Sequence, residues 1–249
     1  MIYDQSDFEL RCEWGEQAVS QLAPISDVVV IVDVLSFSTS VEIATNNGAI
    51  IYPYRWRDES AIDYALSVNA ELASSKRTSS NGYSLSPASL LNIPLGTRLV
   101  LPSPNGASLT LRTGKIPTLA GCLRNCKAVA QLAQGYGTKI AVIPAGERWE
   151  DGSLRPAIED LIGAGAILRY LKGKRSLEAE VAIAAFHGLK DNLMSALQGC
   201  SSGKELIAWG FAKDVELAAT INTSSCVPLF AQNAYVKRET VHLPPVDPN

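Results

Sequence analysis

The segment Val28–Val32 consists of five consecutive apolar residues and is followed at once by a carboxylate, Asp33. A continuous apolar run of this length is typical of a strand that is buried on both faces. Asp33 falls where such a strand would end. The hydroxyl-rich residues 36–40 then lead into a helical pattern that begins near Ser40. The segment therefore predicts a strand, a polar turn and a helix, in that order.

Two interpretations of this turn stay open. In the first, a metal ion binds the Asp33 carboxylate, and an anion binds the backbone N–H groups and the hydroxyls of Ser38 and Thr39 at the start of the helix. In the second, Asp33 only caps the turn. The segment by itself favours neither.

Strand-like and helical patterns alternate along the first two thirds of the chain. A strand over Arg98–Leu101 runs into the polar turn Pro102–Ser108, and a strand over Lys139–Pro144 runs into the acidic loop Ala145–Gly152. Alternation of this kind predicts an α/β fold, with α/β/α layers around a parallel or mixed sheet. If these strands are parallel to the first one, all three turns share the edge of the sheet where α/β proteins bind ligands.

Helical patterns dominate from about residue 157 onward, so we expect a helix-rich C-terminal third that ends in extended segments at 227–230 and 234–237. The length of 249 residues suits one large domain. We expect a single α/β domain over residues 1–249, with a division into two sub-lobes (about 1–115 and 116–249) as the alternative.

The composition excludes several classes of protein. With 47% hydrophobic and 19% charged residues the chain is ordinary globular material, and no apolar run approaches the length of a membrane span. A net charge of −3 without a stripe of Lys and Arg argues against nucleic acid as a partner. The odd number of cysteines and the lack of a signal-peptide pattern favour reduced thiols in the cytoplasm. His187 and His242 are the only histidines, which excludes a metal site built on several of them.

Acidic residues follow two of the predicted strand ends. Glu147, with Asp151 nearby, lies in the acidic loop, and Glu159 and Asp160 lie in the first turn of a helix. Neighbouring helical residues point about 100° apart, so only one of that pair is expected to face the ligand edge. Hard oxygen ligands without histidine suit Mg²⁺ or Mn²⁺. The alternative is that the pair complements the helix dipole, worth about 0.3–1 kcal/mol.

Three further segments offer groups for an anion. Asn105 and Gly106 form either a plain turn or a nest of exposed N–H groups. Arg124 and Asn125 stand at a predicted helix start, where they either reach an anion or lie at the surface. Residues 74–94 are polar and form a long loop, which in a compact domain is either a binding loop or disordered.

Taken together, these segments resemble one family, the Mg²⁺-dependent 2-phosphosulfolactate phosphatases of coenzyme M biosynthesis. Their order and spacing agree with that family from roughly residue 27 to residue 230. The matching pieces are Val32–Leu35 with Ser38 and Thr39, Pro104–Ala107, Leu123–Asn125 with Ala128–Ala130, Ala145 with Gly146, Glu159–Gly165, and residues from Ser202 to Pro228.

The resemblance implies hydrolysis of 2-phosphosulfolactate to sulfolactate and phosphate, with a small anionic substrate as the partner and a homodimer as one option for assembly. Attack by water or by a side chain stays open, with Cys122 as one conceivable nucleophile. The implied roles are catalysis by Asp33 and Glu159, Mg²⁺ binding by Asp33, Glu159 and Asp160, and substrate binding by Ser38, Thr39, Asn105, Gly106, Arg124 and Asn125.

Two departures bear on the substrate. The family usually carries Arg directly after its Asp-Val-Leu, where this chain has Ser36, and its Gly-Glu-Arg segment corresponds here to a region with Lys76 and Arg77 but no Glu. Serine does not replace a bidentate arginine. Alternatives are therefore an anion-binding or regulatory homologue without turnover, and a hydrolase of another small acidic metabolite.

Overall fold

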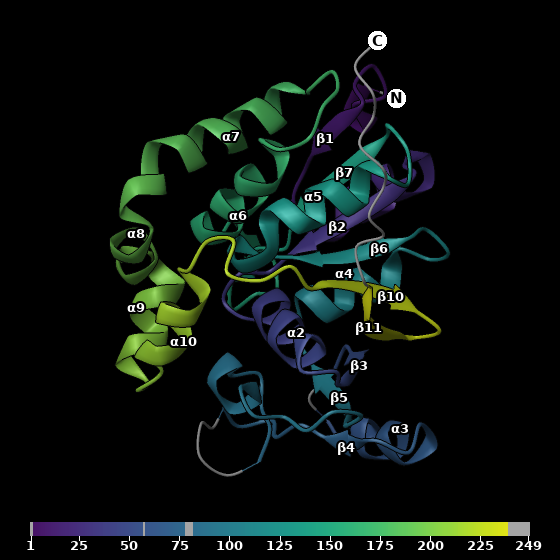
Figure 1. Ribbon diagram of the computed structural model, residues 1–249, viewed down its shortest axis with the longest axis vertical. Helices are drawn as coiled ribbons and strands as arrows, with labels where there is room; N and C mark the ends of the chain where they lie inside the picture. Colours follow the sequence, from purple (N-terminus) through teal and green to yellow (C-terminus); the bar gives the residue numbers. More distant parts are fainter. Residues whose placement is uncertain (1, 57, 78–81, 239–249) are drawn as a thin grey trace.

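A nine-stranded mixed sheet forms the centre of the computed structural model, which describes residues 2–56, 58–77 and 82–238 (Figure 1). The predicted α/β fold is therefore confirmed. In spatial order the strands of this described part are β1 (Leu10–Cys12), β7 (Ile140–Pro144), β2 (Val28–Val32), β6 (Thr118–Gly121), β10 (Val227–Ala231), β11 (Ala234–Arg238), β3 (Ile50–Tyr54), β5 (Arg98–Pro102) and β4 (Glu71–Leu72).

The first four strands in this order are parallel to one another. Val32 is in register with Pro144, so Asp33 and Ala145 leave the sheet at the same edge. Strands β10 and β11 are each antiparallel to their neighbours, which makes β3, β5 and β4 run opposite to the first group. The sequence analysis placed three turns at one edge on the condition that their strands are parallel. That condition holds for β2 and β7 and fails for β5.

Helices cover both faces of the sheet. Val28, Val30 and Val32 pack into a core shared with α5 (Cys126–Gln134) and α6 (Ile158–Leu168), whereas Val29 and Ile31 pack against α1 (Gly15–Leu22) and α4 (Gly106–Arg112). The alternation follows from the two-residue period of a strand, and both faces are apolar because both are buried. Helix α2 (Phe37–Asn46) packs mainly against β6, β10, β11 and β3, and α3 (Ser60–Ser67) packs beside β4 and β5.

The C-terminal third is rich in helices, as predicted, and lies to one side of the sheet (Figure 1). Gly165 in α6 brings this group close, because a Cβ there would overlap the carbonyl group of Ala182 in α7. The helices are α7 (Leu177–Leu189), α8 (Leu193–Gly199), α9 (Ser201–Ala208) and α10 (Ala212–Ala218).

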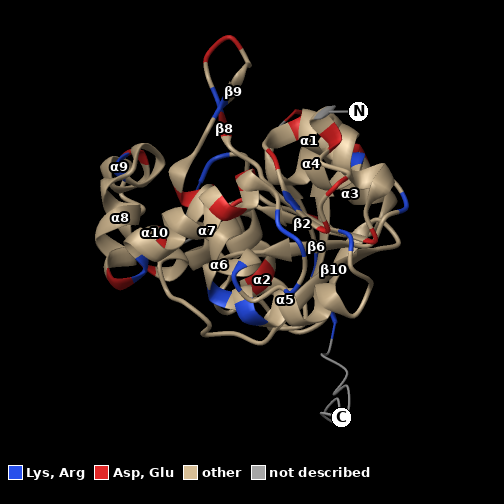
Figure 2. Ribbon diagram, turned by 90° about the horizontal axis from the view of Figure 1, so that it is seen from above, with Lys and Arg blue, Asp and Glu red and all other residues tan. Residues whose placement is uncertain are grey.

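The acidic loop predicted at 145–152 is instead part of a hairpin. Strands β8 (Glu147–Arg148) and β9 (Leu154–Arg155) pair with each other and project from the body of the molecule (Figure 2). Within the described residues, no helix has both the length and the apolar character needed to cross a membrane.

Candidate active site

Asp33 ties the end of β2 to the starts of two helices. Its Oδ1 accepts the N–H of Phe37, the first residue of α2, at 3.0 Å, and its Oδ2 accepts the N–H of Gly106, the first residue of α4, at 2.9 Å. Burial raises the pKa of Asp33, and the N–H donors oppose that rise. The turn after β5 thus reaches the end of β2 despite the opposite direction of its strand.

A small residue is required at position 106. A Cβ on Gly106 would lie 2.8 Å from Asp33 Oδ2 and would overlap the ring of Phe37. Glycine therefore allows the backbone of α4 to approach the carboxylate closely. The Asp33 side chain caps the turn, as the second interpretation of this segment requires. It also lines a cavity, so the first interpretation, metal binding, stays open.

Asp160 joins the ends of β2 and β7. Its Oδ1 accepts the N–H of Val34 at 2.7 Å, and its Oδ2 accepts the N–H of Gly146 at 2.9 Å. Burial raises the pKa of Asp160 well above its usual value, and the nearby charges of Asp33 and Glu159 raise it further. Because each oxygen is bonded to the backbone, this carboxylate holds two strand ends together.

Glu159 lies close to the same carboxylates. It is buried, and after burial itself its charge is the next cause that raises the pKa of the Cys200 thiol to about 12. The charge of Glu159 also contributes to the raised pKa of Asp33 and of Glu147. The charges of Asp33 and Glu159 both act on Asp160, so the three carboxylates lie near one another, but of the three only Asp33 lines the cavity described below.

Glu147, at the start of the hairpin, belongs to this acidic cluster. Its Oε2 accepts a hydrogen bond from Asn105 Nδ2 at 2.7 Å. Burial, followed by the charge of Asp33, raises the pKa of Glu147 to about 7, although the Asn105 bond opposes the shift. The sequence singled out Glu147 as an acidic residue after a strand but did not assign it to the site.

A cavity of about 490 Å³ opens beside Asp33 and Glu147. Its walls come from the ends of β2 and β5, the segment 74–77, the start of β8, and residues 205–211 around the end of α9. Carboxylates and cations both face this space. The charged and amide side chains on its walls are Asp33, Lys76, Arg77, Asn105, Glu147 and Glu205.

Ser38 and Thr39 are engaged with the backbone of the strand-to-helix turn. Ser38 Oγ accepts the N–H of Asp33 at 3.0 Å and donates to the carbonyl of Ile31 at 3.1 Å. Thr39 Oγ1 donates to the carbonyl of Val34 at 2.8 Å. Both hydroxyls are fully buried and stabilise the turn that presents Asp33.

Arg124 and Asn125 belong to a different cluster, because neither is among the described residues that line the cavity. Arg124 Nε forms a buried ion pair with Glu42 Oε2 at 2.6 Å. The side chain of Asn125 bonds to the backbone of Cys122, Ala120 and Cys226. These contacts fasten the start of α5 to its surroundings.

The other groups considered from sequence also lie elsewhere. Cys122 is fully buried, and burial raises the pKa of its thiol, which disfavours the thiolate needed for attack. His187 is on α7 beside the ring of Phe186. His242 falls outside the described residues. Within the described part of the chain, no group of three or more His, Cys, Asp or Glu residues is arranged as a metal site.

This geometry defines an α/β protein with a charged cavity built at strand ends. A family model described as 2-phosphosulpholactate phosphatase matches residues 16–233. The chain therefore belongs to the 2-phosphosulpholactate phosphatase family, which places it among the phosphoric monoester hydrolases, and the resemblance noted in the sequence is confirmed.

Individual relatives span most of the chain. It is 29% identical over 211 residues to the 2-phosphosulfolactate phosphatase of Methanothermobacter thermautotrophicus, covering 82% of this chain and 87% of the relative. It is 30% identical over 211 residues to the probable 2-phosphosulfolactate phosphatase of Carboxydothermus hydrogenoformans, with coverages of 80% and 84%. A shorter match, 28% over 145 residues, links it to the 2-phosphosulfolactate phosphatase of Methanocaldococcus jannaschii and covers 55% of this chain and 58% of the relative.

Proposed function

We propose that the chain is an Mg²⁺-dependent phosphatase that hydrolyses 2-phosphosulfolactate to sulfolactate and phosphate. The observation that carries the proposal is the pair Asp33 and Glu147, two carboxylates that line one cavity and lie close enough for the charge of Asp33 to raise the pKa of Glu147. Membership of the phosphatase family supplies the reaction class. The predicted substrate and cofactor follow from the resemblance to this family, and the predicted cytoplasmic location follows from the cysteines and the N-terminal pattern; all three stay predictions.

The residues present fit a magnesium ion. Mg²⁺ is usually held by one or two carboxylates, with waters and substrate phosphate completing its shell, so a three-residue protein cage is not needed. Asp33 and Glu147 would hold it from the cavity wall. This set replaces Asp160 and Glu159 of the sequence prediction, because neither of those two is among the described residues that line the cavity.

The chain itself would position the phosphoryl group. When bound, Mg²⁺ would supply positive charge against the phosphoryl oxygens. The hydroxyls of Ser36 and Ser103 and the amide of Asn105 line the same cavity and can bond to the remaining oxygens. A water oxygen then bonds to phosphorus as the ester oxygen leaves, so the products are phosphate and the free hydroxyl of sulfolactate.

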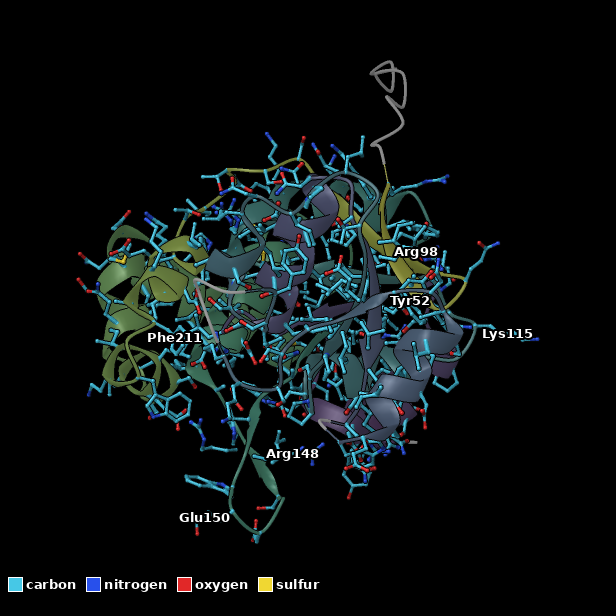
Figure 3. All side chains as sticks on the ribbon, turned by 90° about the horizontal axis from the view of Figure 1, so that it is seen from below. Tyr52, Arg98, Lys115, Arg148, Glu150 and Phe211 are labelled. Carbon is cyan, nitrogen blue, oxygen red and sulfur yellow. The ribbon has the colours of Figure 1, made fainter. Side chains whose placement is uncertain are left out.

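The test is release of phosphate from 2-phosphosulfolactate by the full chain, with and without Mg²⁺ after treatment with EDTA. We expect turnover that requires the ion and that falls at least about 100-fold in Asp33→Asn, because the variant loses a ligand charge. Glu150→Gln is the matched control, since Glu150 lies on the projecting hairpin away from the cavity (Figure 3). Absence of phosphate release under every condition would contradict the proposal.

Metal binding has an independent readout. An ion that binds the native state at 100 times its Kd raises the free energy of unfolding by about 2.7 kcal/mol. We expect Mg²⁺ to stabilise the wild type and Glu150→Gln in urea unfolding, and not Asp33→Asn. Equal stabilisation of all three proteins would place the ion elsewhere.

A further inference from the structure

Arg77 reaches into the cavity from the segment that precedes the undescribed residues 78–81. Its Nη1 forms an ion pair with Asp214 Oδ2 at 2.7 Å, and its Nη2 donates to Ser36 Oγ at 3.0 Å. Its guanidinium carbon lies 5.5 Å from the centre of the Phe211 ring. Figure 3 shows Phe211 at the helical side of the molecule. Three contacts from two segments, the turn after β2 and the start of α10, thus fix the orientation of one cation.

The ion pair is asymmetric in exposure. The Asp214 side chain is only 1% exposed, whereas that of Arg77 is 16% exposed and lines the cavity. Asp214 also accepts hydrogen bonds from Ser86 Oγ at 2.6 Å and from the N–H of Ala88 at 3.1 Å. The carboxylate therefore lies behind the guanidinium, which presents its outer side to the cavity.

Arg77 can bind an anion while this pair stays intact. A guanidinium has five N–H donors in a planar fork, and Asp214 and Ser36 take one each among the described residues. Lys76 lines the same cavity and adds a second positive charge. This wall contrasts with the one formed by Asp33 and Glu147, so the cavity has a basic side and an acidic side.

We propose that Arg77, assisted by Lys76, binds one of the two acidic groups that the substrate carries besides its phosphoryl group, the sulfonate or the carboxylate. The inference rests on the proposed function and deepens it by naming a specificity-determining residue. Without a cation on this wall, a second negative group would meet only Asp33, Glu147 and Glu205 among the charged walls of the cavity. The guanidinium therefore selects phosphomonoesters that carry another acid over those that carry none.

The experiment compares two substrates in wild type, Arg77→Met and Arg77→Lys. One is 2-phosphosulfolactate, and the other is p-nitrophenyl phosphate, which has no second acidic group. We expect Arg77→Met to lower kcat/KM for 2-phosphosulfolactate about 10- to 100-fold, mostly through KM, and to change kcat/KM for p-nitrophenyl phosphate less than about threefold. Arg77→Lys is expected to fall between the two, because a point charge replaces a fork. An equal fall for both substrates, or no fall, overturns the proposal.

Two controls separate specificity from folding. Arg175→Met removes a partly exposed arginine that pairs with Glu180 outside the cavity, and it should leave both activities unchanged. Ser36→Arg combined with Arg77→Ala returns a guanidinium to the same wall, because the side chains of 36 and 77 meet at 3.0 Å. We expect this double variant to recover selectivity that Arg77→Ala lacks, which a purely structural role of Arg77 would not produce.

Failure of the proposed function is distinguishable from failure of this inference. If the wild type hydrolyses neither compound, the phosphatase assignment fails, and calorimetry with sulfolactate then tests Arg77 alone. If the wild type binds sulfolactate and its affinity is at least about 10-fold higher than that of Arg77→Met, the anion subsite is supported. Equal affinity of the two proteins, or no binding by the wild type, overturns it.

Discussion

Replacement of Glu147 by glutamine should remove a pH dependence of folding stability. In the native protein, burial and the charge of Asp33 raise the pKa of Glu147 from 4.5 to about 7. Between these values the native state keeps a proton that the unfolded chain has lost, so the free energy of unfolding falls as pH rises. The loss is complete above about pH 7. Glutamine cannot ionise, and its amide oxygen can still accept the hydrogen bond from Asn105.

The size of the effect follows from the shift. At about 1.4 kcal/mol for each pH unit, a rise from 4.5 to about 7 corresponds to about 3 kcal/mol. We therefore expect the stability of Glu147→Gln relative to wild type to increase by up to about 3 kcal/mol between pH 4.5 and pH 8. The sign is opposite to that of a carboxylate in a salt bridge, which stabilises the native state as pH rises.

The assay is urea unfolding of both proteins from pH 4.5 to pH 8 in EDTA, because a bound divalent cation would favour the charged carboxylate and mask the effect. Glu150→Gln is the control, since it removes the same charge from an exposed position on the same hairpin. If the wild type and Glu147→Gln give parallel curves across this range, Glu147 is not a buried acid in solution, and the argument for the acidic cavity loses its main support.

Three other substitutions test how the site is held. Gly106→Ala should destabilise the fold by about 1–3 kcal/mol in urea unfolding and lower phosphatase activity, because the new Cβ would press on Asp33 and Phe37; unchanged stability would show that α4 can move away. Ser38→Ala should cost about 1–3 kcal/mol by leaving the buried N–H of Asp33 without its acceptor. Arg124→Met should cost about 3–5 kcal/mol by leaving Glu42 as an unpaired buried charge, with KM of the folded enzyme unchanged. A large rise in KM would contradict this prediction and would show that Arg124 contributes to substrate binding.

Local patterns predicted several of the strands and the helix-rich C-terminal third because the causes of these elements are local. The run Val28–Val32 is apolar on both faces, and it forms β2 with those bounds. Helix α2 begins at Phe37, earlier than the predicted Ser40, because Asp33 Oδ1 accepts the Phe37 N–H. The extended segments at 227–230 and 234–237 form β10 and β11, but their place between β6 and β3 depends on pairings with strands far away in the chain.

The composition of the site was harder to predict because it depends on contacts between distant segments. Glu147 enters the site through a bond to Asn105, 42 residues earlier, and Arg124 leaves it through an ion pair with Glu42, 82 residues earlier. The sequence singled out Glu147 as an acidic residue after a strand, and Arg124 as a cation at a helix start. Neither property says which partner a side chain contacts once the sheet is assembled. The sequence therefore assigned Arg124 and not Glu147 to the site, whereas Glu147 lines the cavity and Arg124 does not.

The departure at Ser36 shows how such a contact changes an interpretation. Taken alone, serine at that position removes an arginine from the loop after Asp33 and favours a homologue without turnover. In the folded chain Arg77 places its Nη2 3.0 Å from the Ser36 hydroxyl, so a guanidinium stands on the same wall although it comes from another segment. Loss of charge at one position therefore does not imply loss of charge in the cavity. Assays of the Arg77 variants therefore test the alternative of an inactive homologue, because they show whether this cation binds substrate or only pairs with Asp214.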